Sequence, residues 1–349
     1  MKFMIPTTGA KFHSPKNFGP LLNACEHRFR FVPERFSPHS QKLARMVEYA
    51  RRNKESLQDE ATRRELQALS EAEAYEVAAL VCGARLHSAS IPVGRKIGFT
   101  NKTIWSEYRI DTPIWGYMYS SSVTAKDHPG HYRLQWRPSS FRLEPKLEPE
   151  IIFGIRKAPK ASMSPDELLR CIGWFAHGFE LVHSIYPEWR FTASEAIAAG
   201  AVHRQLVIGD RATIPENLNH HKSEALQQEL RDFHITMYSR GTSRKRDDVE
   251  MGTGSGRDVL GSPLNALRHL CELLEAQDLH PRITAGEIIT TGTVTRAFDV
   301  KQADTWWRSE YQGTSEADTF PTEGAPRGMR MAIFCREKKL DGEEAQKGP

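Results

Sequence analysis

Two glutamates separated by one residue, Glu148 and Glu150, lead into the short apolar segment "IIFGI". On a strand, side chains two residues apart leave the same face, about 7 Å apart along the chain. Two carboxylates could therefore converge on one point. Pro149 between them cannot donate a backbone hydrogen bond, so we expect an edge strand or an irregular strand start here. The alternative is a solvent-facing edge on which the two glutamates share no role.

A third carboxylate, Glu180, lies in "FELVHS", where the flanking residues predict burial. An ionised carboxylate in an apolar setting is very costly unless it is neutralised, paired with a base or bound to a cation. Carboxylates without cysteine or clustered histidine nearby form an all-oxygen ligand set, which hard divalent ions prefer. The three glutamates together predict a site for Mg²⁺, Mn²⁺ or Ca²⁺.

Lys96 is the candidate proton-transfer group. It lies in "GRKIGFT", a largely apolar segment bounded by glycine. Burial there would lower the pKa of the ammonium group and suit it to proton transfer, or its charge would pair with a substrate anion. The alternative is a surface lysine whose stem covers apolar residues.

The elements that position these residues follow from periodicity and capping signals. Helix formers fill "QKLARMVEYARRNKES" and "DEATRRELQALS", and Ser70 with Glu73 makes a capping box for the next helix. Shorter helices are predicted after Ser164, Thr192 and Ser262. The apolar stripe expected after Ser164 consists of Leu168, Leu169, Ile172, Phe175 and Ala176.

Strand-rich sequence follows the first helices. Short β-rich segments bounded by Gly or Pro include "IPVGRKIGFT", "PIWGYMYSSSV", "EIIFGI", "FELVHSI", "QLVIGD", "GEIITTGTVTRAF" and "RMAIFC". Helices first and a strand-rich body with scattered helices indicate an α+β fold. The pattern lacks the regular βαβ alternation of a doubly wound sheet.

Composition narrows the function class. The 349 residues carry a net charge of +4, too little to argue for nucleic acid by itself. The basic segment 239–246 is followed at once by two aspartates, so we expect a solvated loop and no nucleic-acid partner, with nucleic-acid binding through this segment as the alternative. Apolar stretches are shorter than the ~20 residues of a membrane helix. Five widely spaced cysteines without a C-x-x-C pair favour reduced thiols in a cytoplasmic protein. A mitochondrial location stays open as an alternative.

Four segments, in order, resemble blocks of the 2-keto-4-pentenoate hydratases, which belong to the fumarylacetoacetate hydrolase superfamily, on the branch that also holds the oxalocrotonate decarboxylases. The segments are "GRKIGFTNKTIWSEYRIDTPIWG", "LEPEIIFGI", "HGFELVHSIYPEWRF" and "VLGSPLNALRHLCELLEAQDLHPRITAGEIITTGTVTRAF". The resemblance covers roughly residues 40–310. It implies a mixed β-sandwich roll with flanking helices, assembled as a homodimer or larger homo-oligomer.

The resemblance also implies a site and a chemistry. Mg²⁺ or Mn²⁺ would be held by the three glutamates, Lys96 would lie near a small 2-oxoacid, and Thr295 would lie near the carboxylate end of that substrate. Asp111 keeps an acidic position of the first block. The reaction would be lyase chemistry, hydration or decarboxylation, through a metal-stabilised enolate. Carbon–carbon bond hydrolysis and keto–enol tautomerisation are alternatives that use the same intermediate.

The chain departs from the family pattern at several polar positions. Ile114, His183 and the segment 198–200, "AAG", replace family residues that carry polar side chains. His183 is a candidate acid or base because the ordinary pKa of histidine is near neutral; the alternative is a core histidine. The losses also leave open a non-catalytic oligomeric scaffold.

The domain organisation expected is an irregular arm over 1–38, a catalytic domain over 39–338 and a disordered tail over 339–349.

Overall fold

The computed structural model describes residues 35–88, 90–108, 110–125, 131–136, 142–241, 247–301, 305–314 and 328–335. Most of the predicted arm and the whole predicted tail lie outside these residues. The α-helices are α2 (Pro38–Asn53), α3 (Glu60–Gln67), α4 (Glu71–His87), α5 (Trp105–Tyr108), α6 (Pro165–Cys171), α7 (Ala193–Ala198), α8 (His220–Asp232) and α9 (Pro263–Glu275). Short 3₁₀ turns are η2 (Lys102–Ile104), η4 (Pro187–Trp189) and η5 (Gly256–Asp258). No helix among these residues is long and apolar enough to cross a membrane.

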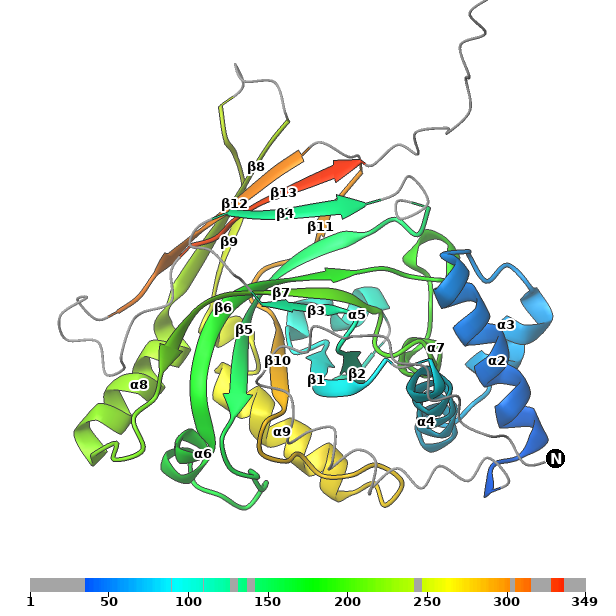
Figure 1. Ribbon diagram of the computed structural model, residues 1–349, viewed down its shortest axis with the longest axis horizontal. Coiled ribbons are helices and arrows are strands. Elements are labelled where there is room, and N and C mark those ends of the chain that lie inside the picture. The colour runs from blue at the N-terminus through cyan, green and yellow to red at the C-terminus, as the bar shows by residue number, and fades with distance from the viewer. Residues whose placement is uncertain are drawn as a thin grey trace, which may run out of the picture.

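The strands form two sheets (Figure 1). The larger sheet has the order β2-β1-β10-β5-β6-β7-β3, with β11 paired to β5, and the smaller has the order β4-β13-β12-β8-β9. The larger sheet contains β1 (Pro92–Gly98), β2 (Ile114–Tyr119), β3 (Val123–Ala125), β5 (Lys146–Ile155), β6 (Ile172–Val182), β7 (His203–Thr213), β10 (Ile288–Thr293) and β11 (Phe298–Asp299). The smaller contains β4 (His131–Trp136), β8 (His234–Gly241), β9 (Val249–Ser255), β12 (Thr305–Gln312) and β13 (Arg330–Cys335).

Apolar side chains of both sheets belong to one core. Phe153 and Phe179 of the larger sheet share a buried cluster with Met237, Trp307 and Met331 of the smaller one. The α+β layout predicted from the sequence is confirmed by this mixture of two sheets with helices between and around their strands. The sheets provide the rigid frame on which the acidic residues are mounted.

Pro149 lies on an interior strand with irregular pairing, so of the two alternatives the edge strand is wrong and the irregular strand is confirmed. β5 pairs with β6 on one side and with β10 on the other. The register of the β5–β10 ladder shifts between Thr290 and Thr293, and the Pro149 carbonyl accepts from the Val294 N–H at 2.9 Å instead. This irregularity accommodates a residue that has no N–H to donate, because the bulge lies on the partner strand.

The helix after Ser164 is shorter than predicted. It begins with the expected capping box, but ends at Cys171, and Ile172, Phe175 and Ala176 belong to β6. Ile172 already has strand geometry, with φ −97° and ψ 125°. β6 pairs along its length with β5 and β7, and this pairing overrides the helical spacing of the apolar residues. Glu180 therefore sits near the end of a long central strand.

A separate helical layer packs at one end of the larger sheet. α2, α3, α4 and α7 contact one another and bury a second apolar cluster that includes Leu43, Val47, Leu66 and Tyr186. In Figure 1 these helices stand together at the blue, N-terminal side of the molecule. The helices predicted from Ser70, Thr192 and Ser262 are confirmed as α4, α7 and α9.

Candidate metal site and cleft

The three glutamates come together on two neighbouring strands. Glu148 and Glu150 leave the same face of β5, and Glu180 of β6 lies directly opposite Glu148 in the ladder. One carboxylate oxygen from each of the three lies within 4.8 Å of the others. The side chains of Glu150 and Glu180 are fully buried and that of Glu148 is 15% exposed. The alternative of a solvent-facing strand edge is thus excluded.

Two buried oxygens of this cluster lack a hydrogen-bond partner among the described residues, Oε1 of Glu150 and Oε2 of Glu180, and the second of them faces the Lys96 ammonium. Oε2 of Glu150 accepts a hydrogen bond from the Gly292 N–H at 3.1 Å. Oε1 of Glu150 is buried and has no hydrogen-bond partner among the described residues. An unpartnered buried carboxylate oxygen is rare because its desolvation is not compensated. Three converging carboxylates with such an oxygen fit a hard divalent cation.

The Lys96 ammonium lies within the cluster and pairs with its carboxylates. Its Nζ lies 2.9 Å from Oε2 of Glu180 and 3.9 Å from Oε2 of Glu148. The side chain is 3% exposed, so the surface-lysine alternative is excluded. Burial lowers the pKa of Lys96, but the surrounding carboxylates outweigh it and raise that pKa above its ordinary value. The expectation of a lowered pKa is therefore wrong, because it did not count three acidic neighbours.

The three carboxylates differ in how readily they ionise. Burial raises the pKa of Glu148 to about 7 and that of Glu150 well above its ordinary value, with Glu180 adding to both. Burial acts on Glu180 in the same direction, but Lys96 and His203 together bring the pKa of that carboxyl down to about 2. Without a further cation, one lysine cannot keep three buried carboxylates ionised.

Mg²⁺ affinity is expected to fall with acidification, by about tenfold between pH 8 and pH 6 for each proton that binding displaces near pH 7. The stability of the metal-free protein should instead increase with acidification. A carboxyl whose folded pKa is raised, such as Glu148, stabilises the fold below the unfolded value of 4.5 and loses that contribution as the pH rises through about 7. Calorimetric Mg²⁺ titrations at pH 8 and pH 6 would check the fall in affinity. Melting curves in EDTA at the same two pH values would check the rise in metal-free stability. A pH-independent affinity would contradict the assignment of these carboxylates as ligands.

A cavity of about 780 Å³ opens beside the cluster. Its lining includes Lys96, Glu148 and Gly292 from the cluster and its surroundings, together with the charged residues Lys146 and Arg296. Its aromatic lining residues are Phe99, Tyr108, Trp189, Phe191, Phe298 and Trp307. Such a volume lies within the range of small-molecule sites.

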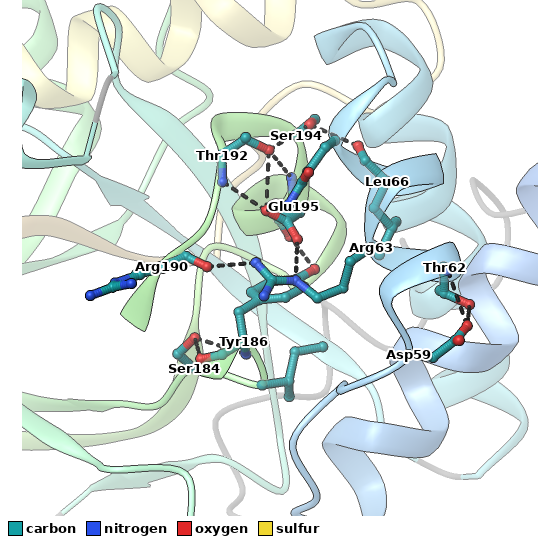
Figure 2. Close-up of polar contacts among 12 residues, drawn as sticks. Asp59, Thr62, Arg63, Leu66, Ser184, Tyr186, Arg190, Thr192, Ser194 and Glu195 are labelled. Carbon is teal, nitrogen blue, oxygen red and sulfur yellow. Dashed lines mark hydrogen bonds and ion pairs between the residues drawn. The ribbon is translucent and has the colours of Figure 1, made fainter. Parts of the chain in front are cut away.

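The aromatic wall of the cavity is held by the helical layer. Figure 2 shows Arg63 of α3 reaching the Glu195 carboxylate at 2.9 Å and the Arg190 carbonyl at 2.7 Å. The 3₁₀ turn η4, directly before Arg190, holds Glu188 and Trp189 at φ 55° and 57°. Non-glycine residues rarely adopt this left-handed region. The Trp189 Nε1–H donates to the Glu144 carbonyl at 2.8 Å. These contacts fix the indole at the cavity.

The remaining predicted site residues lie elsewhere. Asp111 is exposed on the bend before β2. Thr295 is buried and its hydroxyl donates to the Arg296 carbonyl at 2.8 Å, while its neighbours Thr293 and Arg296 line the cavity. His183 is buried, and burial followed by the positive charge of Arg51 lowers its pKa well below the ordinary value. None of the three is a lining residue of the cavity as far as the described residues show, and their functional roles stay predictions.

Two polar residues at the site were missed from the sequence. His203 at the start of β7 contacts Glu180 at 2.6 Å, and Lys146 precedes Glu148 by two residues on β5. The "K" of "KLEPE" carries the same period-two signal as the glutamates and could have been found from it. His203 could not, because its place beside Glu180 depends on the β6–β7 register.

Comparisons with known proteins agree with the resemblance. No family model matches the chain. A 4-oxalocrotonate decarboxylase of a Pseudomonas species is 26% identical over 232 residues, covering 66% of this chain and 78% of that protein. A 2-keto-4-pentenoate hydratase of Burkholderia vietnamiensis is 24% identical over 217 residues, covering 61% and 72%.

A solved structure shows the same fold. The 4-oxalocrotonate decarboxylase from Pseudomonas putida, complexed with magnesium and adipate, superposes with a TM-score of 0.66 at 20% identity, over 87% of this chain and 98% of that one. In sequence the chain is thus similar to 4-oxalocrotonate decarboxylase and 2-keto-4-pentenoate hydratases, and it has the fold of the solved decarboxylase.

Proposed function

We propose that the protein is a divalent-metal-dependent lyase, of hydratase or decarboxylase type, acting on a small 2-oxoacid or its enol. The observation that carries this is the convergence of Glu148, Glu150 and Glu180 within 4.8 Å, with a buried carboxylate oxygen that has no partner among the described residues. These residues would hold Mg²⁺ or Mn²⁺. When bound, such an ion supplies Lewis-acid stabilisation of the negative charge on an enolate.

Lys96 has the proton-handling role in this proposal. Its ammonium group lines the cavity and stays charged because its acidic neighbours raise its pKa. It therefore reaches the substrate as a donor of a hydrogen bond or proton at Nζ, and not as a free base. Trp189 and Phe191 line the same cavity.

Further cations in the cavity lining favour a second anionic group on the substrate. Lys146 leaves the same face of β5 as Glu148, about 7 Å further along the strand. Its ammonium lies 4.5 Å from the Trp189 ring centroid and 3.9 Å from the Asp299 carboxylate. Besides Lys96, the cations that line the cavity are Lys146, Arg240, Arg296 and Lys301, and its acidic lining residues are Glu148 and Asp299. A 2-oxoacid with a terminal carboxylate is thus favoured over a monocarboxylate, and the solved relative was complexed with the dicarboxylate adipate.

Proton exchange at carbon 3 of a 2-oxoacid tests the proposal, because every candidate reaction passes through the same enolate. We expect the Mg²⁺-loaded protein to exchange this proton with D₂O, faster for 2-oxoadipate than for 2-oxohexanoate, as followed by proton NMR. EDTA should stop the exchange. Absence of exchange for both acids would contradict the proposal and favour the scaffold alternative.

Carbon–carbon bond hydrolysis and tautomerisation remain the second choice, since they need the same site. Product analysis of a substrate that exchanges would separate them from hydration and decarboxylation. A homodimer or larger homo-oligomer and a cytoplasmic location also stay predictions. Neither enters the argument for the site.

A further inference from the structure

His203 is a buried histidine that the proposed chemistry leaves without a role. It opens β7, and its side chain is 1% exposed. Its Nδ1 lies 2.6 Å from Oε1 of Glu180 and its Nε2 lies 2.8 Å from Oγ of Ser122. Both ring nitrogens therefore have a polar partner, and one of these partners is a carboxylate of the candidate metal site.

The partners determine where the ring proton lies. An ionised Glu180 only accepts, so Nδ1 carries the proton and donates it. Nε2 can then accept from the Ser122 hydroxyl. The single hydroxyl proton of Ser122 can be donated either to Nε2 at 2.8 Å or to the Tyr119 carbonyl at 3.0 Å. Glu180 thus fixes the tautomer, and contacts on both sides fix the orientation of the ring.

These contacts divide the two oxygens of Glu180. Oε1 accepts from His203, whereas Oε2 lies 2.9 Å from Nζ of Lys96. A hydrogen bond from His203 on β7 and the ion pair with Lys96 on β1 therefore hold the carboxylate from two sides. A carboxylate fixed in this way needs no reordering to act as a ligand.

His203 is itself held from the helical layer. The Arg51 guanidinium of α2 is buried, and its Nη2 donates to the His203 carbonyl at 3.1 Å. Its Nη1 donates to the Ala199 carbonyl. Gly200 lies between these two carbonyls at φ 67°, and a Cβ there would clash with the guanidinium. The "AAG" segment has no polar side chains of its own, so the polar contacts here come from Arg51 and His203.

We propose that His203 is a positioning residue that fixes Glu180 for the metal ion, through a hydrogen bond from Nδ1 to Oε1, and that Arg51 holds its backbone in place. This inference rests on the proposed function, because it concerns the ligand geometry of the same site. It adds a residue that no sequence signal identified. It also couples the metal site to helix α2, which lies outside the sheet.

The test compares three substitutions at one position by Mg²⁺ titration in a calorimeter. His203→Asn keeps a donor at the place of Nδ1, His203→Gln keeps one at the place of Nε2, and His203→Leu keeps neither. His280→Leu is the matched control, since His280 is also buried and contacts Tyr117 and Tyr75 through its two ring nitrogens away from the site. Melting curves in EDTA report the structural cost of each change.

We expect His203→Leu and His203→Gln to weaken Mg²⁺ binding about 10–100-fold. His203→Asn should recover most of this affinity, and His280→Leu should lose stability without losing affinity. Should His203→Leu fail to fold, the Asn and Gln variants still decide the question. Equal affinity in those two variants, or wild-type affinity in His203→Leu, would overturn the positioning role. Failure of the wild-type protein to bind Mg²⁺ would instead overturn the proposed function, and this inference with it.

Discussion

Glu150→Gln is expected to abolish Mg²⁺ binding while making the metal-free protein more stable. Glu150 is fully buried beside Glu180, and burial followed by the Glu180 charge raises its pKa. A neutral amide removes this repulsion but also removes a ligand with an unpartnered oxygen. At a Mg²⁺ concentration 100 times the dissociation constant, wild type gains about 2.7 kcal/mol from the ion, and the variant should gain none. Melting curves with EDTA and with Mg²⁺ measure both effects.

Glu287→Gln is the control for this experiment. Glu287 is also buried, but it pairs with Arg95 at 2.6 Å, away from the cluster. Removing one partner of a buried ion pair leaves an uncompensated charge, so this variant should be less stable in EDTA and should keep its full response to Mg²⁺. Equal Mg²⁺ stabilisation of Glu150→Gln and wild type would show that Glu150 is not a ligand.

Lys96→Met is expected to lower the free energy of unfolding in EDTA by about 3–5 kcal/mol, because Glu180 is left buried without its cation. This decrease in stability should reach its full size between about pH 5 and pH 10. Glu180, with its pKa lowered to about 2, stabilises the fold above the unfolded value of 4.5. Lys96, with a raised pKa, does so below its unfolded value of 10.5. Urea unfolding at pH 4 and pH 8 would show the smaller loss at the acid pH.

Mg²⁺ separates the structural role of Lys96 from its chemical role. A dication takes over the neutralisation of the carboxylates, so Lys96→Met should regain most of its stability with Mg²⁺ and bind the ion at least as tightly as wild type. Proton exchange at carbon 3 of 2-oxoadipate should nevertheless be lost. Unchanged exchange in this variant would mean that Lys96 only balances charge.

The residues that could be found from the sequence are those whose type conflicts with their neighbourhood. Glu148, Glu150 and Glu180 are charges in apolar strand segments, and their convergence follows from period-two geometry once both strands pair. Lys96 was found in the same way, although the direction of its pKa shift depended on neighbours that only the fold brings near. Local patterns thus identified the ligands but not their electrostatics.

The features that were missed depend on pairing between distant segments. Ile172 and Phe175 have helical spacing, yet the ladders of β5 and β7 place them on a strand. The position of Pro149 on an interior strand requires a bulge in β10, which lies far along the chain. His203 and Arg51 meet Glu180 and the 199–203 turn only through register and helix packing. No local pattern contains that information.

Titration of metal-stripped protein with Mg²⁺, with and without oxalate as an enolate mimic, tests the central claim most directly. The account predicts tight binding to wild type that oxalate strengthens, and no binding to Glu150→Gln. Glu287→Gln should bind as wild type does. Absence of binding to the wild-type protein, or binding that Glu150→Gln leaves unchanged, would contradict a metal site built from the three glutamates.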